Sequence, residues 1–218
     1  MLTGKGIWTS AYKRFAHSTA IAGLSPTIQT IDIGLTEDTY FAQGTPTTNF
    51  DGNTVYSIGE FDTNANRAWI KPDFTSLPYS VQFLSATLKL TPTAEVSTNA
   101  RTMRAHRCLR DVVSNQATWN IWKTANNWGT AGASGSGTDY EATEMGHSNT
   151  QISASPTLNV QLDAINFDAA LLQNLQNGTY TNNGIVLFVD TQSSDRVSYA
   201  SKDHATSAYR PIITITYY

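Results

Sequence analysis

Short stretches in which hydrophobic and polar residues alternate recur along most of this chain. In "VQFLSATLKLTP", Phe83, Ala86, Leu88 and Leu90 roughly alternate with polar residues. The closing segment "RPIITITYY" has a similar alternation. Successive side chains of a strand point to opposite faces of a sheet, so this period indicates strands that are buried on one face.

Turn-forming residues divide the chain into nine or ten such segments, and Asp51-Gly52 is typical of a hairpin turn. One helix is predicted over 164–177, with Gly178 as its C-cap. The polar stretch 124–156 is too rich in glycine for a helix, and we expect a structured loop system there. The pattern therefore predicts an all-β protein: an antiparallel, jelly-roll-like β-sandwich with one short helix and a long loop rich in Trp and Gly. The predicted strands lie within 27–34, 38–45, 55–61, 66–74, 81–92, 101–112, 157–163, 183–190, 195–203 and 210–218.

The first 27 residues differ from the rest of the chain. They carry Lys5, Lys13, Arg14 and His17 but no acidic residue, and their apolar residues are scattered. We predict an N-terminal arm or docking segment over 1–27, followed by one sandwich domain over 28–218. The alternative is a strand or short helix that folds back on the domain.

Composition excludes several classes of protein. A chain of 218 residues can bury a sizeable core in one domain, and its net charge of −3 predicts no general affinity for nucleic acid. The single Cys108 excludes an intrachain disulfide and a cysteine-based zinc site, and we expect it to be a small buried strand residue. No segment approaches the roughly 18 apolar residues of a membrane span, and the first 20 residues do not resemble a secretory signal.

Several sequence landmarks occur together and in order: "EDTYF", "YSIGEF", "NRAWIKPDFTSLP", "FLSATLKLTP", "ATWN", "GTAGASGSGTDY", "NNGIVLFVD", "VSYASKDH" and "RPIITITYY". This order resembles the DNRLRE-domain family of β-sandwich carbohydrate-binding modules related to disaggregatase repeats. The resemblance covers roughly 36–218. Asp203 departs from it, because the family more often has Glu there. Pro72 departs too, since it removes a ladder donor and so predicts an edge strand or a bulge.

The resemblance implies structural roles for the residues of its motifs. Trp119 is expected to fill one end of the sandwich, and Asn120 and Asp139 to bond to the loop backbone. In the strand that Arg67 begins, the alternation predicts that Trp69 faces away from its neighbours. The structural residues that we predict are Arg67, Trp119, Asn120, Asp139, Tyr140 and Arg210.

A carbohydrate site needs aromatic faces for the C–H surface of a sugar and polar side chains for its hydroxyls. The loop at 117–140 has both. The candidate ligand-binding residues are Trp122, Lys123, Asn126, Asn127 and Trp128. The alternative, that tryptophans of this loop fill the fold instead, stays open for Trp122 and Trp128.

A calcium site would need six or more oxygen ligands, and no other cofactor is expected. The candidates are Asp51, Asn53, Asp62 and Asn64, with Asn66 and the pair Glu37-Asp38 beside them. Turn formation explains these Asp and Asn residues equally well.

Catalysis is the least favoured hypothesis. Glu141, Glu144 and His147, or Lys202, Asp203 and His204, resemble acid–base groups, but the chain has no G-x-S-x-G, H-E-x-x-H or phosphate-loop motif.

An extracellular type of module without a secretory signal is typical of a virion protein, which is made in the cytoplasm of a host and released by lysis. We therefore expect a non-enzymatic phage structural protein, a capsid decoration or a tail appendage. Its arm would hold capsid or tail proteins, and its sandwich would face outward, with host-surface glycans as candidate ligands and a homo-oligomer left open. The alternatives are a free extracellular carbohydrate-binding module and, less favoured, a polysaccharide-cleaving enzyme.

Overall fold

The computed structural model describes residues 26–96, 101–148, 156–189 and 195–218. Within them the chain is antiparallel β-structure with one α-helix, which confirms the all-β prediction. The elements are β1 (Gln29–Ile33), β2 (Leu35–Ala42), β3 (Val55–Phe61), β4 (Asn64–Pro72), β5 (Phe83–Leu90), β6 (Pro92–Val96), β7 (Met103–Cys108), β8 (Ile121–Lys123), β9 (Asn126–Asn127), β10 (Tyr140–His147), β11 (Leu162–Phe167), α1 (Ala169–Gln176), β12 (Ile185–Val189), β13 (Arg196–Ala200), a 3₁₀ turn (Ser207–Tyr209) and β14 (Ile212–Tyr217).

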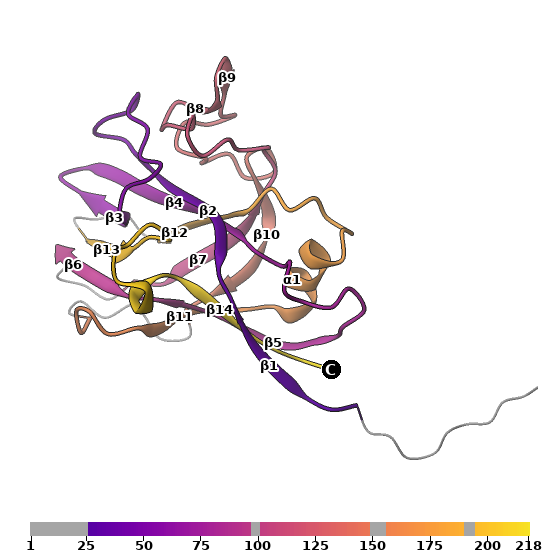
Figure 1. Cartoon of the computed structure of the whole chain (residues 1–218). Helices are drawn as coiled ribbons and strands as arrows, with labels where there is room; N and C mark the ends of the chain where they lie inside the picture. The colour runs from indigo at the N-terminus through magenta and orange to yellow at the C-terminus, as the bar shows by residue number, and fades with distance from the viewer. Residues whose placement is uncertain (1–25, 97–100, 149–155, 190–194) are drawn as a thin grey trace, which may run out of the picture.

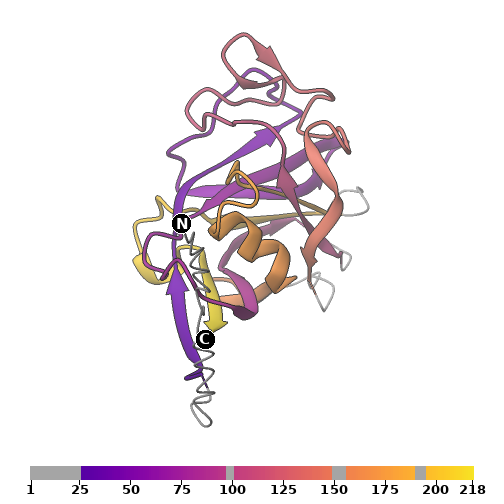
Figure 2. The ribbon, with the colours of Figure 1, turned by 90° about the vertical axis from the view of Figure 1, so that its right-hand side faces the viewer.

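Twelve strands form one sheet that curls into two facing layers (Figures 1 and 2). One layer has the order β1-β14-β5-β11, and the sheet continues through β10-β7-β12-β4-β3-β13-β6 in the other, where β2 also pairs with β4. The path from β1 to β2 turns from one layer to the other at Gly34, and the path from β5 to β6 does so at Thr91. The layers are therefore joined at their corners, as in a sandwich.

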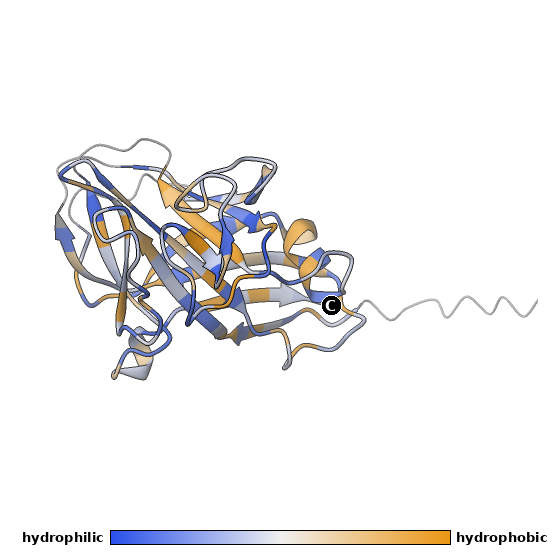
Figure 3. Ribbon diagram, turned by 90° about the horizontal axis from the view of Figure 1, so that it is seen from above, coloured by the Kyte–Doolittle hydropathy of each residue, from blue (hydrophilic) through white to orange (hydrophobic). Residues whose placement is uncertain are grey.

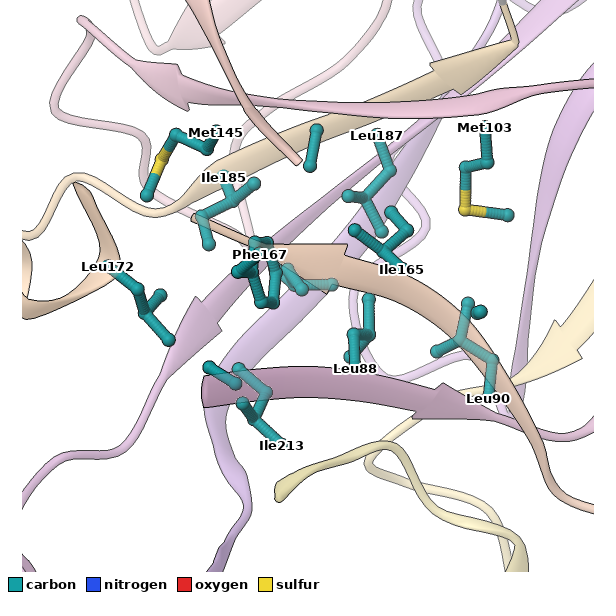
Figure 4. Packing of buried hydrophobic residues seen from close by; sticks show 14 of the residues in the cluster. Leu88, Leu90, Met103, Met145, Ile165, Phe167, Leu172, Ile185, Leu187 and Ile213 are labelled. Carbon is teal, nitrogen blue, oxygen red and sulfur yellow. The ribbon is translucent and has the colours of Figure 1, made fainter. Parts of the chain in front are cut away.

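The main core lies between the layers. Side chains from β5, β11 and β14 point toward those from β7 and β12, as Figure 4 shows, and orange and blue segments alternate along the strands in Figure 3. The helix α1 adds Leu172 and Leu175 to this core. The side chain of Asp168 caps the N-terminus of the helix by accepting the Leu171 N–H.

The predicted helix over 164–177 is half wrong, because its first part is the strand β11. Ala164, Ile165 and Phe167 are buried where β11 pairs with β5, so tertiary pairing overrides the helical pattern. The helix begins only after the Asp168 cap, and Gly178 follows its last turn with a φ of +78°.

Two turn and loop predictions also need correction. Asp51-Gly52 is a turn inside the 43–54 connection and joins no paired strands, whereas the tight hairpin turn is Asp62-Thr63, between β3 and β4. The predicted loop 124–156 contains the eight-residue strand β10, because 140–147 pairs with β7. At Pro72 an edge strand or a bulge in its own strand was expected, but β4 pairs with β2, β3 and β12, and the irregularity lies in the partner strand β2, where Thr36 is the extra residue between Leu35 and Glu37 opposite this proline.

Residues 1–25 of the predicted arm lie outside the described residues. No helix in the described part of the chain is long and apolar enough to cross a membrane.

Candidate functional site

The segment 109–139 covers the outer face of β2, β4, β7 and β12 and builds a second buried cluster there. Trp69 points into this cluster, whereas its neighbours Ala68 and Ile70 point into the main core, as the alternation predicted. Cys108 is buried in it, and burial raises the pKa of its thiol to about 12. The cluster consists of Phe41, Ala65, Trp69, Cys108, Val112, Ala117, Trp119, Trp128, Ala133, Val186 and Phe188.

Asp139 fixes the shape of this segment, which we call the cap (residues 109–139). Its side chain is 0% exposed, and its carboxylate accepts the N–H groups of Gly129 at 2.7 Å, Thr130 at 2.8 Å and Gly135 at 3.0 Å. The Arg110 Nε adds an ion pair at 3.1 Å. A carboxylate bonded in this way satisfies main-chain donors that the cap would otherwise bury unpaired.

Two of the predicted tryptophans lie inside the molecule. Trp119 is 9% exposed and Trp128 is 5% exposed. The Trp128 indole N–H donates to the Thr118 carbonyl at 2.9 Å, and its ring lies 5.1 Å from that of Phe41. A Cβ on Gly132 would lie 2.4 Å from the Trp119 ring, so only glycine allows this approach. Neither ring therefore offers a face to a ligand.

Trp122 and Lys123 lie on the small β8–β9 hairpin at the top of Figure 1. The Lys123 ammonium lies 4.4 Å from the centre of the half-buried Trp122 ring and 3.5 Å from the Asp111 carboxylate. Asn126 donates to the Thr124 carbonyl and so holds the hairpin turn, and the exposed Asn127 pairs with Ile121. The hairpin thus projects from the sheet with the Trp122 ring half-buried beneath the Lys123 ammonium.

Of the other predicted structural residues, Arg67 and Tyr140 adjoin the cap, Asn120 lies within it and Arg210 lies apart from it. The Arg67 guanidinium lies 4.5 Å above the Phe188 ring, bonds to the Ala133 carbonyl at 3.3 Å and is hydrogen-bonded to Tyr140. Burial lowers its pKa. The expectation for Asn120 needs correction: its side chain is exposed and makes no hydrogen bond to the described residues, and only its main chain takes part, donating to the Pro46 carbonyl and accepting the main-chain N–H of Trp128. Arg210 lies elsewhere and donates to the His204 carbonyl at 2.8 Å.

The calcium candidates occupy turns. Asp62 and Thr63 have φ angles of 49° and 62°, as a tight hairpin turn requires, and Asn64 donates to the Asp62 carbonyl at 2.8 Å. Asp51 donates its N–H to Asn49, and the side chain of Asn53 bonds to Tyr40. Among the described residues, no group of three or more His, Cys, Asp or Glu side chains is placed to hold a metal ion.

Most of the acid–base candidates are held in ion pairs, whereas His204 accepts the main-chain N–H of Thr206. Glu141 meets Arg107 at 2.7 Å, and Glu144 is bonded to both Arg104 and His147. Burial acts to raise the pKa of Glu144, but the hydrogen bonds from Arg104 and His147 outweigh it and lower this pKa, which disfavours a general acid. Near the other candidate group, Lys202 pairs with Asp203 at 2.9 Å.

A groove of about 340 Å³ opens where β2, β3, β4 and β13 meet the loop after β2. Tyr40 and Phe50 stack in it with centroids 4.1 Å apart. Phe61 is 44% exposed, and the Arg196 guanidinium lies 4.8 Å from the centre of its ring. The groove is lined by Tyr40, Ala42, Gly44, Thr45, Phe50, Ser57, Phe61, Asn64, Asn66 and Arg196.

This groove was not predicted from the sequence, although Asn64 and Asn66 were candidates for another role, as calcium ligands. Arg196 and Phe61 are far apart in the chain and meet only because β13 pairs with β3. The available signal was Phe61 itself, an aromatic residue next to the polar turn "DTN" at the end of a strand.

Comparison with known proteins adds no relative: no protein-family model matches the chain, and no curated protein is significantly similar to it.

Proposed function

We propose that this protein is a non-enzymatic glycan-binding module and that the groove beside Phe61 holds the sugar. The observation that carries the proposal is one concave surface that combines the exposed Phe61 ring and the half-buried rings of Tyr40 and Phe50 with amides, a hydroxyl and a guanidinium. Aromatic faces pack against the C–H surface of sugars, while amide, hydroxyl and guanidinium groups bond to their hydroxyls. The cap, which carries the tryptophans, is then a structural part of the module.

The polar residues of the groove are held in place. Asn64 donates to the Asp62 carbonyl at 2.8 Å and Asn66 to the Asn64 carbonyl at 3.2 Å, which orients both amides. The Ser57 hydroxyl is bonded to that of Ser198 at 3.0 Å. A rigid set of polar groups binds a ligand with little loss of side-chain entropy.

Binding to an array of neutral and acidic glycans tests this proposal. We expect the wild type to bind at least one glycan class, Phe61→Ala to lose at least tenfold in affinity, and Trp122→Ala to bind like the wild type. Absence of binding by the wild type, or loss in Trp122→Ala with retention in Phe61→Ala, contradicts it.

The position of the termini supports display of this module on a particle. Gln29 at the start of β1 pairs with Tyr217, so the chain enters the domain beside its C-terminus. The β8–β9 hairpin lies at the opposite end in Figures 1 and 2, and the path through β1 and β2 leads from the entry point to the groove at Ala42. We therefore infer a virion structural protein that is anchored by residues 1–27, with a free extracellular module as the alternative.

Deletion of residues 1–27 distinguishes a virion structural protein from a free extracellular module. In a virion protein the deletion abolishes incorporation into particles and leaves glycan binding unchanged. Incorporation at the wild-type level contradicts the anchoring role. Membership of the DNRLRE-domain family also stays a proposal; the roles of Arg67 and Asp139 in holding the cap support it.

A further inference from the structure

A buried carboxylate lies behind the wall of the groove. Asp38, on β2, is 2% exposed, and its Oδ2 accepts the main-chain N–H of Lys202 at 2.7 Å. Within the described part of the chain this is the one hydrogen bond of the carboxylate. An ionised carboxylate is normally bonded to several donors when it is buried, so that of Asp38 is poorly compensated.

The turn that contacts Asp38 is connected to the groove. Ser201 donates its hydroxyl to the Asn53 carbonyl at 2.6 Å and its N–H to the Thr54 carbonyl at 3.0 Å. The side chain of Asn53 bonds in turn to Tyr40, which forms the groove wall together with Phe50. Asp38 and Tyr40 also lie two positions apart on β2 and therefore on the same face of the strand.

The groups around Asp38 leave its charge largely uncompensated. Lys202 is the cation facing it, and Asp203 and Asp51 add negative charge from the two neighbouring turns. From β3, Tyr56 faces Asp38, and the hydroxyls of Tyr56 and of its neighbour Tyr199 on β13 are both buried without a hydrogen-bond partner among the described residues. Burial is the largest effect and raises the pKa of Asp38 to about 6.

We propose that Asp38 is a pH-sensitive latch on the 201–203 turn. The closed turn buries the carboxyl, and ionisation of this buried group, which the single Lys202 N–H does not compensate, favours opening of the turn away from the 53–54 turn and hydration of Asp38. The latch is independent of any ligand, whereas its effect on binding rests on the proposed glycan-binding function.

The sign follows from linkage. In the closed state Asp38 binds a proton more tightly than the same side chain does in water, where its pKa is 3.8. Protons therefore favour the closed state, and opening becomes easier as the pH rises from about 4 to about 6 and beyond. If opening fully hydrates Asp38, the opening equilibrium rises about tenfold between pH 5 and pH 7.5.

Hydrogen exchange of the Lys202 and Ser201 amides, followed by NMR and corrected for intrinsic exchange, tests the latch on the full chain. We expect the opening equilibrium of the wild type to rise about tenfold from pH 5 to pH 7.5 and that of Asp38→Asn to change less than twofold. Asp203→Asn, which removes a neighbouring charge and keeps the carboxylate, retains the pH response. Equal pH responses of the wild type and Asp38→Asn overturn the proposal.

Two further measurements keep the latch and the binding function apart. Titration of the Asp38 carboxyl ¹³C signal in the wild type needs no variant, and an ordinary pKa below about 4.5 overturns the latch. On the glycan array, wild type binds more tightly at pH 5 than at pH 7.5, by up to tenfold, and Asp38→Asn binds equally at both. Phe61→Ala loses binding but keeps the exchange response of the wild type, so failure of the groove leaves the test of the latch intact.

Discussion

Asp139 and Asp38 are both buried aspartates, and their surroundings are opposite. Asp139 receives three main-chain N–H groups and the Arg110 guanidinium, whereas Asp38 receives the single N–H of Lys202. The first arrangement gives the carboxylate four donor groups and fixes the cap. The second leaves the Asp38 carboxylate with one donor, and burial raises its pKa. The comparison shows that burial alone does not decide the role of an acidic residue, because the number of donors around it does.

The largest expected effect is that of Asp139→Ala. The substitution leaves the N–H groups of Gly129, Thr130 and Gly135 and the Arg110 side chain without their shared acceptor. We expect the free energy of unfolding to fall by about 4 kcal/mol, as for other buried networks that lose one partner. Urea unfolding measures it, and near-UV circular dichroism reports the loss of order around Trp119 and Trp128. A decrease below about 1 kcal/mol contradicts the role of Asp139.

The effect of Asp38→Asn on the free energy of unfolding has the opposite sign to that of Asp139→Ala, and it depends on pH. The raised pKa of Asp38, about 6 against 3.8, gives stability that is fully present below about pH 4 and lost as the pH rises through about 6. The asparagine of the variant does not ionise, so the variant does not lose this stability as the pH rises. Its free energy of unfolding relative to the wild type should therefore rise by about 2 kcal/mol between pH 4 and pH 7.5.

Urea unfolding of both proteins across this pH range checks the second prediction. Phe61→Ala is a suitable control, because it alters the groove and keeps Asp38. If the free energies of unfolding of Asp38→Asn and the wild type differ by the same amount at all pH values, burial does not raise the pKa of Asp38.

Much of the fold could be predicted from the sequence, because alternation is a local property. The strand around Trp69 and the closing strand follow directly from it. The strand β11 could not be predicted in this way, since Ala164, Ile165 and Phe167 also fit one face of a helix. Only the pairing with β5 decides between strand and helix. The curl of the sheet depends on contacts between distant strands and leaves no local signal.

The site was less predictable than the fold. Asp139 was correctly expected to bond to the loop backbone, as the resemblance of the "GTDY" motif implied. The groove was missed because Phe61 and Arg196 come together only through the pairing of β3 with β13. Asp38 was considered only as a metal ligand, since a sequence shows an acidic residue but not how many donors surround it.

Arg110→Gln tests how much the cation beside Asp139 contributes to stability, because it removes the guanidinium and leaves the three N–H donors. The Arg110 side chain is 32% exposed, so water screens its ion pair with Asp139. We expect a loss of about 1 kcal/mol in the free energy of unfolding, which salt reduces further. A loss as large as that of Asp139→Ala contradicts the view that main-chain donors dominate.

The smallest expected effect is that of Trp122→Ala, in the same cap that Asp139 fixes. The Trp122 ring packs at the margin of the second cluster on the β8–β9 hairpin, and Lys123 covers one of its faces. We expect the free energy of unfolding to fall by less than about 1 kcal/mol, whereas Trp128→Ala, which empties a buried site, lowers it by about 3 kcal/mol or more. Urea unfolding of the two variants side by side measures the difference. Equal losses would show that the hairpin is as tightly integrated into the fold as the tryptophans beneath it, and that the stability of the cap does not decrease outward from Asp139.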